Sequence, residues 1–205
     1  MIFKDRVEAG EKLADKLEGK FKNEGLVLGV PRGGVVAGKV LADKLNWNLD
    51  VLITKKIGFP GQSELAMGAV AEDGGAVWDE QLVGGVGDKE KKIELGKAQK
   101  KVAKYIEEFR GGKELKIKDK TVIIVDDGIA TGKTVEAGIK WLREKGVGKI
   151  VVAVPVCAKD TAKKLKKLVD EWVCLDEPRN FMAVGQFYRE FSQVDDEEVK
   201  GLLVE

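Results

Sequence analysis

The sequence predicts an α/β protein in which a mostly parallel sheet is flanked by helices. Short apolar runs alternate with segments of helical periodicity along the 205-residue chain, a pattern typical of a parallel sheet covered by helices. Glycine-containing turns separate several of these segments. Because no long linker or repeat interrupts the alternation, we expect a single domain over residues 1–205, with a core at about 20–175 and a tail at about 176–205.

The first half of the chain predicts two strands of this sheet. A helix is expected at 5–18, a buried strand at 26–30, a helix from the next glycine turn to about residue 45, and a second strand at 50–54. Residues 57–65 contain glycine and proline and are expected to form a loop. Two short apolar runs flank the sequence EDGG at 72–75, which predicts a hairpin.

The second half predicts a long helix and three further strands. Apolar residues at spacings of three and four mark one face of the long helix; they are Leu95, Ala98, Val102, Tyr105 and Phe109. Strands are then expected at 121–125, 150–154 and 171–175, with helices at 132–145 and 159–169 between them. The tail is expected to be irregular until a short helix near Glu197.

The composition excludes several classes of function. The chain has no histidine, which removes Ser-His-Asp and Cys-His nucleophiles and histidine metal sites. With 36 basic and 35 acidic residues the net charge is +1, so there is no electrostatic reason to expect nucleic acid or a membrane as a partner. The N-terminus lacks a secretory signal and no apolar run could span a bilayer, so we expect a cytoplasmic protein.

Two minor features of the composition say little about function. Charged residues make up 35% of the chain, a composition typical of hyperthermophile surfaces. The only cysteines, Cys157 and Cys174, lie in apolar strand-like runs. We interpret them as reduced thiols of the core.

The segment VIIVDDGIATGKT, residues 122–134, carries the strongest chemical signal. Four apolar residues predict a strand buried on both faces, and Asp126 and Asp127 stand at its carboxyl end, where ligands of open α/β sheets bind. A glycine-containing turn then opens a helix, whose unpaired N–H groups favour an anion. Phosphate alone would be repelled by the two acids. A sugar phosphate explains both features, since carboxylates accept hydrogen bonds from sugar hydroxyls.

Three other interpretations of this segment are disfavoured by the residues themselves. A Walker A loop needs a glycine five residues before Gly132, and that position is Asp127. A dinucleotide-binding fingerprint is also excluded, because no G-x-G-x-x-G follows the first strand. In the third, the acids merely cap the turn; adjacent acids after a buried strand repel each other, which disfavours that interpretation.

With its four apolar residues, two acids and Thr-Gly-x-Thr ending, the segment resembles the phosphoribosyl pyrophosphate motif of type I phosphoribosyltransferases. The resemblance implies that Asp126 and Asp127 hold the ribose hydroxyls. It also implies that the following loop binds the 5′-phosphate; its residues are Gly128, Ile129, Ala130, Thr131, Gly132, Lys133 and Thr134. Lys133 stands where many members of the family have glycine.

Two other segments resemble the pyrophosphate-binding parts of that family. In GVPRGG, residues 29–34, the resemblance implies that Arg32, Gly33 and Gly34 bind pyrophosphate. It implies the same for the basic pair Lys55 and Lys56 after the second strand. The loop expected at 57–65, which includes the polar residues Ser63 and Glu64, would then close over the site as a lid.

The resemblance extends over most of the chain, through the run beginning ITKKIGFPGQSEL and the tail beginning DEPRNFMAVGQFYREF. These resemble a group of phosphoribosyltransferases whose acceptor is unassigned. The implied partners are phosphoribosyl pyrophosphate and a small-molecule acceptor, with no nucleic acid and no membrane, and whether the chain forms a homo-oligomer is left open. Mg²⁺ would be held chiefly by substrate oxygens and water, and no residue is assigned as a metal ligand. Two alternatives stay open: a non-catalytic nucleotide-binding module and a phosphosugar or nucleotide hydrolase.

The tail is expected to contribute to a small acceptor-binding subdomain, the hood of that family. Four aromatic rings lie within 178–191: Phe181, Phe187, Tyr188 and Phe191. We interpret at least two of them as packing the tail onto the core. Because a flat ring can also stack on an acceptor base, we predict that either Phe187 or Tyr188 contacts the acceptor.

Overall fold

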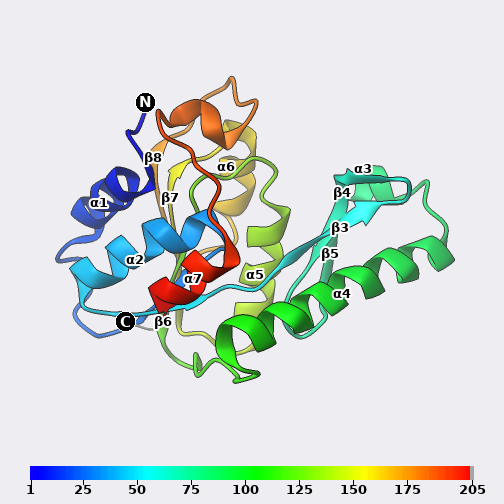
Figure 1. Cartoon of the computed structure of the whole chain (residues 1–205), viewed down its shortest axis with the longest axis horizontal. Helices are drawn as coiled ribbons and strands as arrows, with labels where there is room; N and C mark the ends of the chain where they lie inside the picture. Colours follow the sequence, from blue (N-terminus) through cyan, green and yellow to red (C-terminus); the bar gives the residue numbers. More distant parts are fainter. Residues whose placement is uncertain (204–205) are drawn as a thin grey trace. The chain divides into compact units, whose positions relative to one another are not determined.

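The computed structural model describes residues 1–203, apart from the side chains of Ser63 and Glu64, so the polar groups expected from these two lid residues lie outside the described part. The chain divides into two compact units. Unit 1 comprises residues 1–52, 117–132 and 145–203, and unit 2 comprises 53–116 and 133–144. Each unit has its own sheet (Figure 1).

Unit 1 contains the predicted parallel sheet. Its five strands lie in the order β2-β1-β6-β7-β8, and every neighbouring pair is parallel. The strands are β1 (Leu26–Gly29), β2 (Asn48–Val51), β6 (Thr121–Val125), β7 (Lys149–Val156) and β8 (Glu171–Asp176). The fold class expected from the alternation of apolar runs and helical segments is therefore confirmed, and β6 at the centre of the sheet has the predicted bounds.

Five helical segments belong to unit 1. They are α1 (Arg6–Leu17), α2 (Gly33–Leu45), α6 (Lys159–Leu165), the 3₁₀ turn η1 (Val184–Phe187) and α7 (Asp196–Leu203). Helix α1 begins after Asp5, whose carboxylate caps the helix by accepting a hydrogen bond from the N–H of Glu8 at 2.8 Å. Helices α1 and α2 pack on one face of the sheet, where Leu13, Leu41 and Ile123 are fully buried. Each such side chain contributes about 1.5–3 kcal/mol by its burial.

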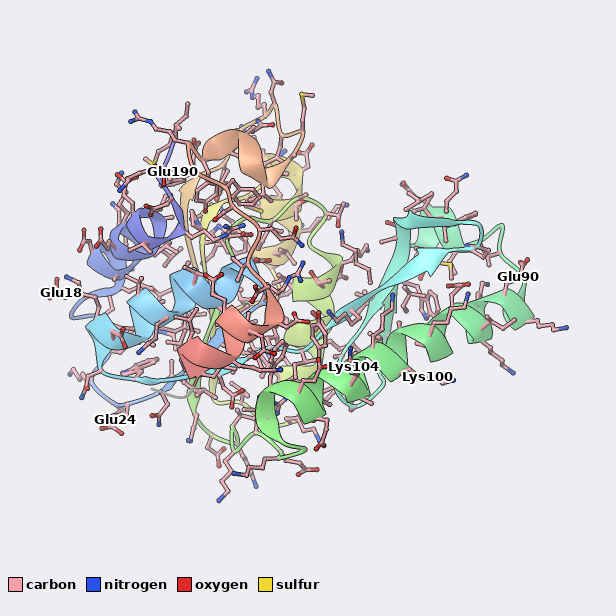
Figure 2. The ribbon with its side chains drawn as sticks, in the orientation of Figure 1. Glu18, Glu24, Glu90, Lys100, Lys104 and Glu190 are labelled. Atoms are coloured by element: carbon pink, nitrogen blue, oxygen red, sulfur yellow. The ribbon has the colours of Figure 1, made fainter. Side chains whose placement is uncertain are left out.

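Unit 2 contains an antiparallel sheet of β3 (Lys55–Phe59), β4 (Gln62–Val70) and β5 (Ala76–Trp78). Its helices are α3 (Glu80–Val83), α4 (Asp88–Arg110) and α5 (Lys133–Glu144). Helix α4 packs on β3 and β4, and α5 packs on β4 and β5. Of the predicted apolar face of α4, Ala98, Val102 and Phe109 are buried, whereas the labelled Lys100 and Lys104 project from the helix as exposed charges (Figure 2).

The loop predicted at 57–65 is wrong, because these residues belong to a hairpin of β3 and β4. The glycines and the proline that indicated a loop instead form the turn and the bulge of this hairpin. Gly61 takes a positive φ of 76° in the turn after Pro60, and the ladder shifts register on both sides of Gly58. A lid at this place would therefore be a hairpin and not a loop.

Other expectations agree with the structure in kind and differ at their ends. The hairpin predicted around 72–75 is confirmed as the β4–β5 turn, in which the N–H of Ala71 donates to the carbonyl of Gly75 at 3.0 Å. The strand predicted at 50–54 instead pairs over Asn48–Val51, although Leu52 and Ile53 beyond it are fully buried. Among residues 1–203, no helix is long and apolar enough to cross a bilayer.

Candidate functional site

The two predicted acids follow the central strand of the unit 1 sheet. All four apolar residues of β6 before them are fully buried, which fixes Asp126 and Asp127 at the carboxyl end of the sheet. The carboxylate of Asp126 accepts a hydrogen bond from the N–H of Asp127 at 2.9 Å. Asp126 and Asp127 therefore lie at the edge of the sheet where ligands of parallel α/β folds bind.

Asp127 is held from both ends of the chain. Its Oδ2 accepts a hydrogen bond from Nε of Arg6 in α1 at 2.7 Å. The hydroxyl of Tyr188, in the tail, donates to the carbonyl oxygen of Asp127 at 2.6 Å. Arg6 was not among the predicted site residues. The available signal was its spacing, because Arg6 lies three and four residues before Ala9 and Gly10 on the buried face of an amphipathic helix.

The acid pair has an electrostatic asymmetry. Burial and the neighbouring Asp127 carboxylate raise the pKa of Asp126 well above its ordinary value, and the Arg6 guanidinium offsets part of this shift. Burial and the same carboxylate also raise the pKa of the Tyr188 hydroxyl, so this group stays a neutral donor. One guanidinium thus interacts with two carboxylates. Because carboxylate oxygens accept hydrogen bonds, the acid pair favours ligands that donate them.

Glycines allow helix α2 to approach the acids closely. A Cβ on Gly33 would lie 1.9 Å from Oδ2 of Asp127, and a Cβ on Gly34 would lie 2.6 Å from the carbonyl oxygen of Val125. Neither distance is compatible with a side chain. The predicted pyrophosphate segment therefore lies against the acid pair in unit 1.

Arg32 lies immediately before α2 in the same segment, where the Pro31–Arg32 peptide is cis. Its Nη1 is 3.8 Å from Oδ1 of Asp196 in α7. About a third of each of the two side chains is exposed, so this loose ion pair is screened by solvent. Arg32 is therefore accessible to an anion that competes with Asp196.

The predicted phosphate loop is held by β7, α6 and the tail. Ile129 donates to the carbonyl of Val156 at 2.9 Å, and its own carbonyl accepts from Ala158 at 2.9 Å. Thr161 Oγ1 donates to the carbonyl of Ala130 at 2.6 Å. Gly132 has a positive φ of 73° that favours glycine. These contacts leave Thr131 exposed on a fixed backbone.

Gly128, at the start of the same loop, packs against the tail. A Cβ there would lie 2.6 Å from Cγ1 of Val184 in η1. At the other end, the chain passes from Gly132 into Lys133 and Thr134, the first residues of α5 in unit 2. Lys133 Nζ lies 3.3 Å from Oε2 of Glu136 in the same turn, a pairing that a phosphate would have to compete with.

The two predicted lysines lie in unit 2 at the start of β3. The Nζ of Lys55 lies 3.3 Å from the centroid of the Tyr105 ring of α4, which gives it a cation–π contact. Lys56 is exposed. Their contact with pyrophosphate stays a prediction.

The tail rings pack mainly within unit 1. Phe187 and Tyr188 are each only 7% exposed and belong to a buried cluster with Phe3, which confirms the interpretation that at least two rings pack the tail onto the core. Phe181 lies 5.1 Å from Phe187, centroid to centroid. The acceptor contact of Phe187 or Tyr188 stays untested, and their burial leaves Phe191, at 39% exposed, as the most open of the four rings.

Among the residues whose placement is described, no group of three or more carboxylates or thiols is arranged to hold a metal ion. Both thiols are free, and burial raises the pKa of each to about 12. Neither cysteine is therefore suited to act as a thiolate nucleophile near neutral pH. The chemistry of the site rests on its two acids, the loops beside them and nearby cations.

Comparisons with known proteins agree on one family. The family model for the phosphoribosyl transferase domain matches residues 3–192. A Mycobacterium tuberculosis protein named "Putative phosphoribosyl transferase" is 39% identical over 209 residues, which cover 98% of this chain and 46% of that protein. The chain thus spans about half the length of the curated relatives it matches.

Solved structures show the same fold. The crystal structure of TT1426 from Thermus thermophilus has a TM-score of 0.84 and 36% identity, covering 100% of this chain and 98% of that one. A purine phosphoribosyltransferase from Pyrococcus horikoshii has a TM-score of 0.51 and 21% identity, covering 93% and 92%. The second likeness supports the architecture alone.

Proposed function

Because the chain belongs to the phosphoribosyl transferase family, we propose that it binds phosphoribosyl pyrophosphate and transfers the phosphoribosyl group to a nitrogenous acceptor, with release of pyrophosphate. One observation carries this proposal: two adjacent carboxylates stand beside a glycine-bearing loop at the carboxyl edge of the unit 1 sheet. A phosphorylated sugar with neighbouring hydroxyls matches both halves of that arrangement.

The ribose would be bound by the acid pair. Asp126 and Asp127 accept hydrogen bonds from two sugar hydroxyls, and charged acceptors make such bonds stronger than neutral ones. Because Oδ2 of Asp127 is already bonded to Arg6, we assign its other oxygen, Oδ1, to the ribose. The carboxylates would also stabilise the positive charge that grows on the ring as the bond from C1 to pyrophosphate breaks.

The two phosphate ends would be bound by the loops on either side of the acids. Backbone N–H groups of residues 130–132, with the hydroxyl of Thr131, take the 5′-phosphate. Arg32 and the backbone at Gly33 and Gly34 take pyrophosphate, which would displace the exposed contact between Arg32 and Asp196.

Mg²⁺ would accompany the substrate. This hard cation prefers oxygen ligands and keeps several waters. Its other ligands would come mostly from the pyrophosphate oxygens of the substrate. The acid pair fits a metal ion held by the substrate, because the Asp127 carboxylate is already paired with Arg6 and so is less available as a metal ligand. The ion would neutralise the departing pyrophosphate, while the side chains of the chain itself orient the ribose.

Incubation of the full chain with Mg²⁺, phosphoribosyl pyrophosphate and a panel of nitrogenous bases tests the proposal. We expect pyrophosphate release that depends on one class of base and is lost in Asp126→Asn/Asp127→Asn. Tight binding without release for any base would instead indicate a binding module. Release without a base would indicate a hydrolase.

A further inference from the structure

Arg6 is the arginine of unit 1 that contacts the acid pair, and it comes from an element outside every predicted binding loop. We infer that Arg6 is a positioning residue for the proposed ribose site: it fixes the Asp127 carboxylate and balances one of the two acid charges. The inference rests on the proposed function, because it assigns Arg6 a task in binding phosphoribosyl pyrophosphate.

The guanidinium of Arg6 is fixed at several points. Its Nε donates to Oδ2 of Asp127 at 2.7 Å, and its Nη1 donates to the carbonyl of Ser192 at 2.8 Å. Its Cζ lies 4.0 Å from the centroid of the Phe191 ring, a cation–π geometry. Two hydrogen bonds in different directions and a stacked ring leave the planar group little freedom to rotate.

This fixed guanidinium restricts Asp127 in turn. Oδ2 is bonded to Arg6, while the backbone carbonyl of the same residue is bonded to Tyr188. Gly33 lies against the Arg6–Asp127 pair, since a Cβ there would also come within 2.7 Å of Nε of Arg6. The carboxylate is therefore presented in one orientation, which lowers the entropy lost when a ribose hydroxyl binds.

The charge of Arg6 matters because the site binds a polyanion. Asp126 and Asp127 interact with Arg6 from the end of β6, the Tyr188 hydroxyl interacts with it from the tail, and Gly33 of α2 lies against its Nε. Without the guanidinium, the acids would repel both each other and the incoming phosphates. Because the guanidinium offsets part of the upward pKa shift of Asp126, its loss should let the pair keep a proton to higher pH.

Ser192 and Phe191 extend the inference to the tail. The carbonyl of Ser192 accepts a hydrogen bond from Arg6, and the ring of Phe191 stacks on its guanidinium. The segment around residue 191 therefore supports the ribose site through Arg6, a task different from the acceptor contact predicted for the tail rings. This connects α1, the tail and the end of β6 through one side chain.

Calorimetric titration with Mg²⁺ and phosphoribosyl pyrophosphate tests the inference on the full chain. The variants are Arg6→Gln, Arg6→Lys and the matched control Lys16→Gln, which removes one exposed charge from the same helix. At about pH 6 we expect Arg6→Gln to bind about tenfold more weakly or worse, a loss of about 1.4 kcal/mol. The loss should vary with pH, because the guanidinium offsets part of the upward pKa shift of Asp126.

Arg6→Lys separates charge from structure. Lysine keeps the positive charge but cannot reproduce both hydrogen bonds, so it should bind more weakly than wild type with an unshifted pH profile. Lys16→Gln should match wild type. If Arg6→Gln fails to fold, the affinity of Arg6→Lys decides the question: a loss supports the inference, and wild-type affinity overturns it.

Several outcomes would overturn the inference. Wild-type affinity in Arg6→Gln at every pH would show that Arg6 has no part in binding. An equal loss at all pH values in folded Arg6→Gln and Arg6→Lys would indicate a purely structural role. If wild type itself does not bind phosphoribosyl pyrophosphate, the proposed function fails first and the inference with it.

Discussion

Each unit contains a buried arginine–carboxylate pair, and the two pairs have different surroundings. Arg6 and Asp127 in unit 1 have side chains 10% and 13% exposed, and Arg110 and Glu72 in unit 2 have side chains 6% and 8% exposed. Glu72 also accepts a hydrogen bond from the N–H of Ile53 at 3.3 Å, which ties the β4–β5 turn to the start of its unit. This pair joins parts of a single unit.

The pair in unit 1 has a second acid beside it. Asp126 adds a negative charge that Arg6 only partly offsets, and Gly33 removes the side chain that would fill the space beside the carboxylate. Burial alone therefore does not distinguish a binding site from a structural ion pair. A binding site is instead distinguished by an excess of negative charge and by glycine at positions where a side chain would collide with the carboxylates. Both features cost stability.

The largest effect on binding is expected from Asp126→Asn/Asp127→Asn. Each lost charged hydrogen bond to ribose should cost about 1.5–3 kcal/mol, so affinity for phosphoribosyl pyrophosphate should fall at least about 100-fold. Calorimetric titration measures the change, with far-ultraviolet circular dichroism to check that the variant is folded. Unchanged affinity would show that the carboxylates of unit 1 have no more part in binding than Glu72 of unit 2.

Glu72→Gln is the counterpart in unit 2. Breaking a buried ion pair is strongly destabilising, so the free energy of unfolding should fall by about 3 kcal/mol. Affinity for phosphoribosyl pyrophosphate should stay at the wild-type value as long as the protein is folded. Urea denaturation and titration at low temperature measure the two quantities, and a selective loss of affinity would contradict a purely structural role for this pair.

Gly33→Ala tests the space cleared beside the acids. The added Cβ would lie 1.9 Å from Oδ2 of Asp127, so the carboxylate must move and affinity should fall by about tenfold. Gly96→Ala in α4 is the matched control, because a Cβ there meets open space. The control should bind normally and gain about 0.5–1 kcal/mol of stability. Equal affinity in both variants would show that the orientation of Asp127 is unimportant.

The smallest effect is expected from Asp126→Asn on stability. Since folding raises the pKa of Asp126 above its ordinary value of 3.8, the folded state binds the proton more tightly than the unfolded state. The wild type therefore loses stability as pH rises from 3.8 through the raised pKa. The variant should be more stable at neutral pH by about 1 kcal/mol, with the difference vanishing in acid. Thermal melts across pH measure this, and a less stable variant at neutral pH would contradict the excess-charge explanation.

The elements around the acids could be predicted from the sequence because their signals are local. The run TVIIV before two acids defines a buried central strand, and its observed bounds are Thr121–Val125. Gly33 and Gly34 follow the first strand directly, so their place at the start of α2 also follows from neighbouring residues. Local patterns thus fixed which residues end at the carboxyl edge of the sheet.

The features that were missed depend on contacts between distant residues. Arg6 and Asp127 are 121 positions apart, and no periodicity connects a helix residue to a particular acid. The β3–β4 hairpin was mistaken for a loop because glycine and proline are typical of loops. In this hairpin Gly58 lies at a bulge, and Pro60 and Gly61 lie in the turn. The hydrogen bond from the Tyr188 hydroxyl to the backbone of Asp127 likewise joins residues 61 positions apart.

Titration of the wild-type chain with phosphoribosyl pyrophosphate in the presence of Mg²⁺ tests the ribose-phosphate site most directly. We expect saturation at one ligand per chain with a dissociation constant of about 1–100 μM, and competition by pyrophosphate and by ribose 5-phosphate, each of which fills part of the site. The same titration of Asp126→Asn/Asp127→Asn should give no measurable heat. Absence of binding to wild type, or equal binding to both proteins, would contradict a ribose site at these two acids.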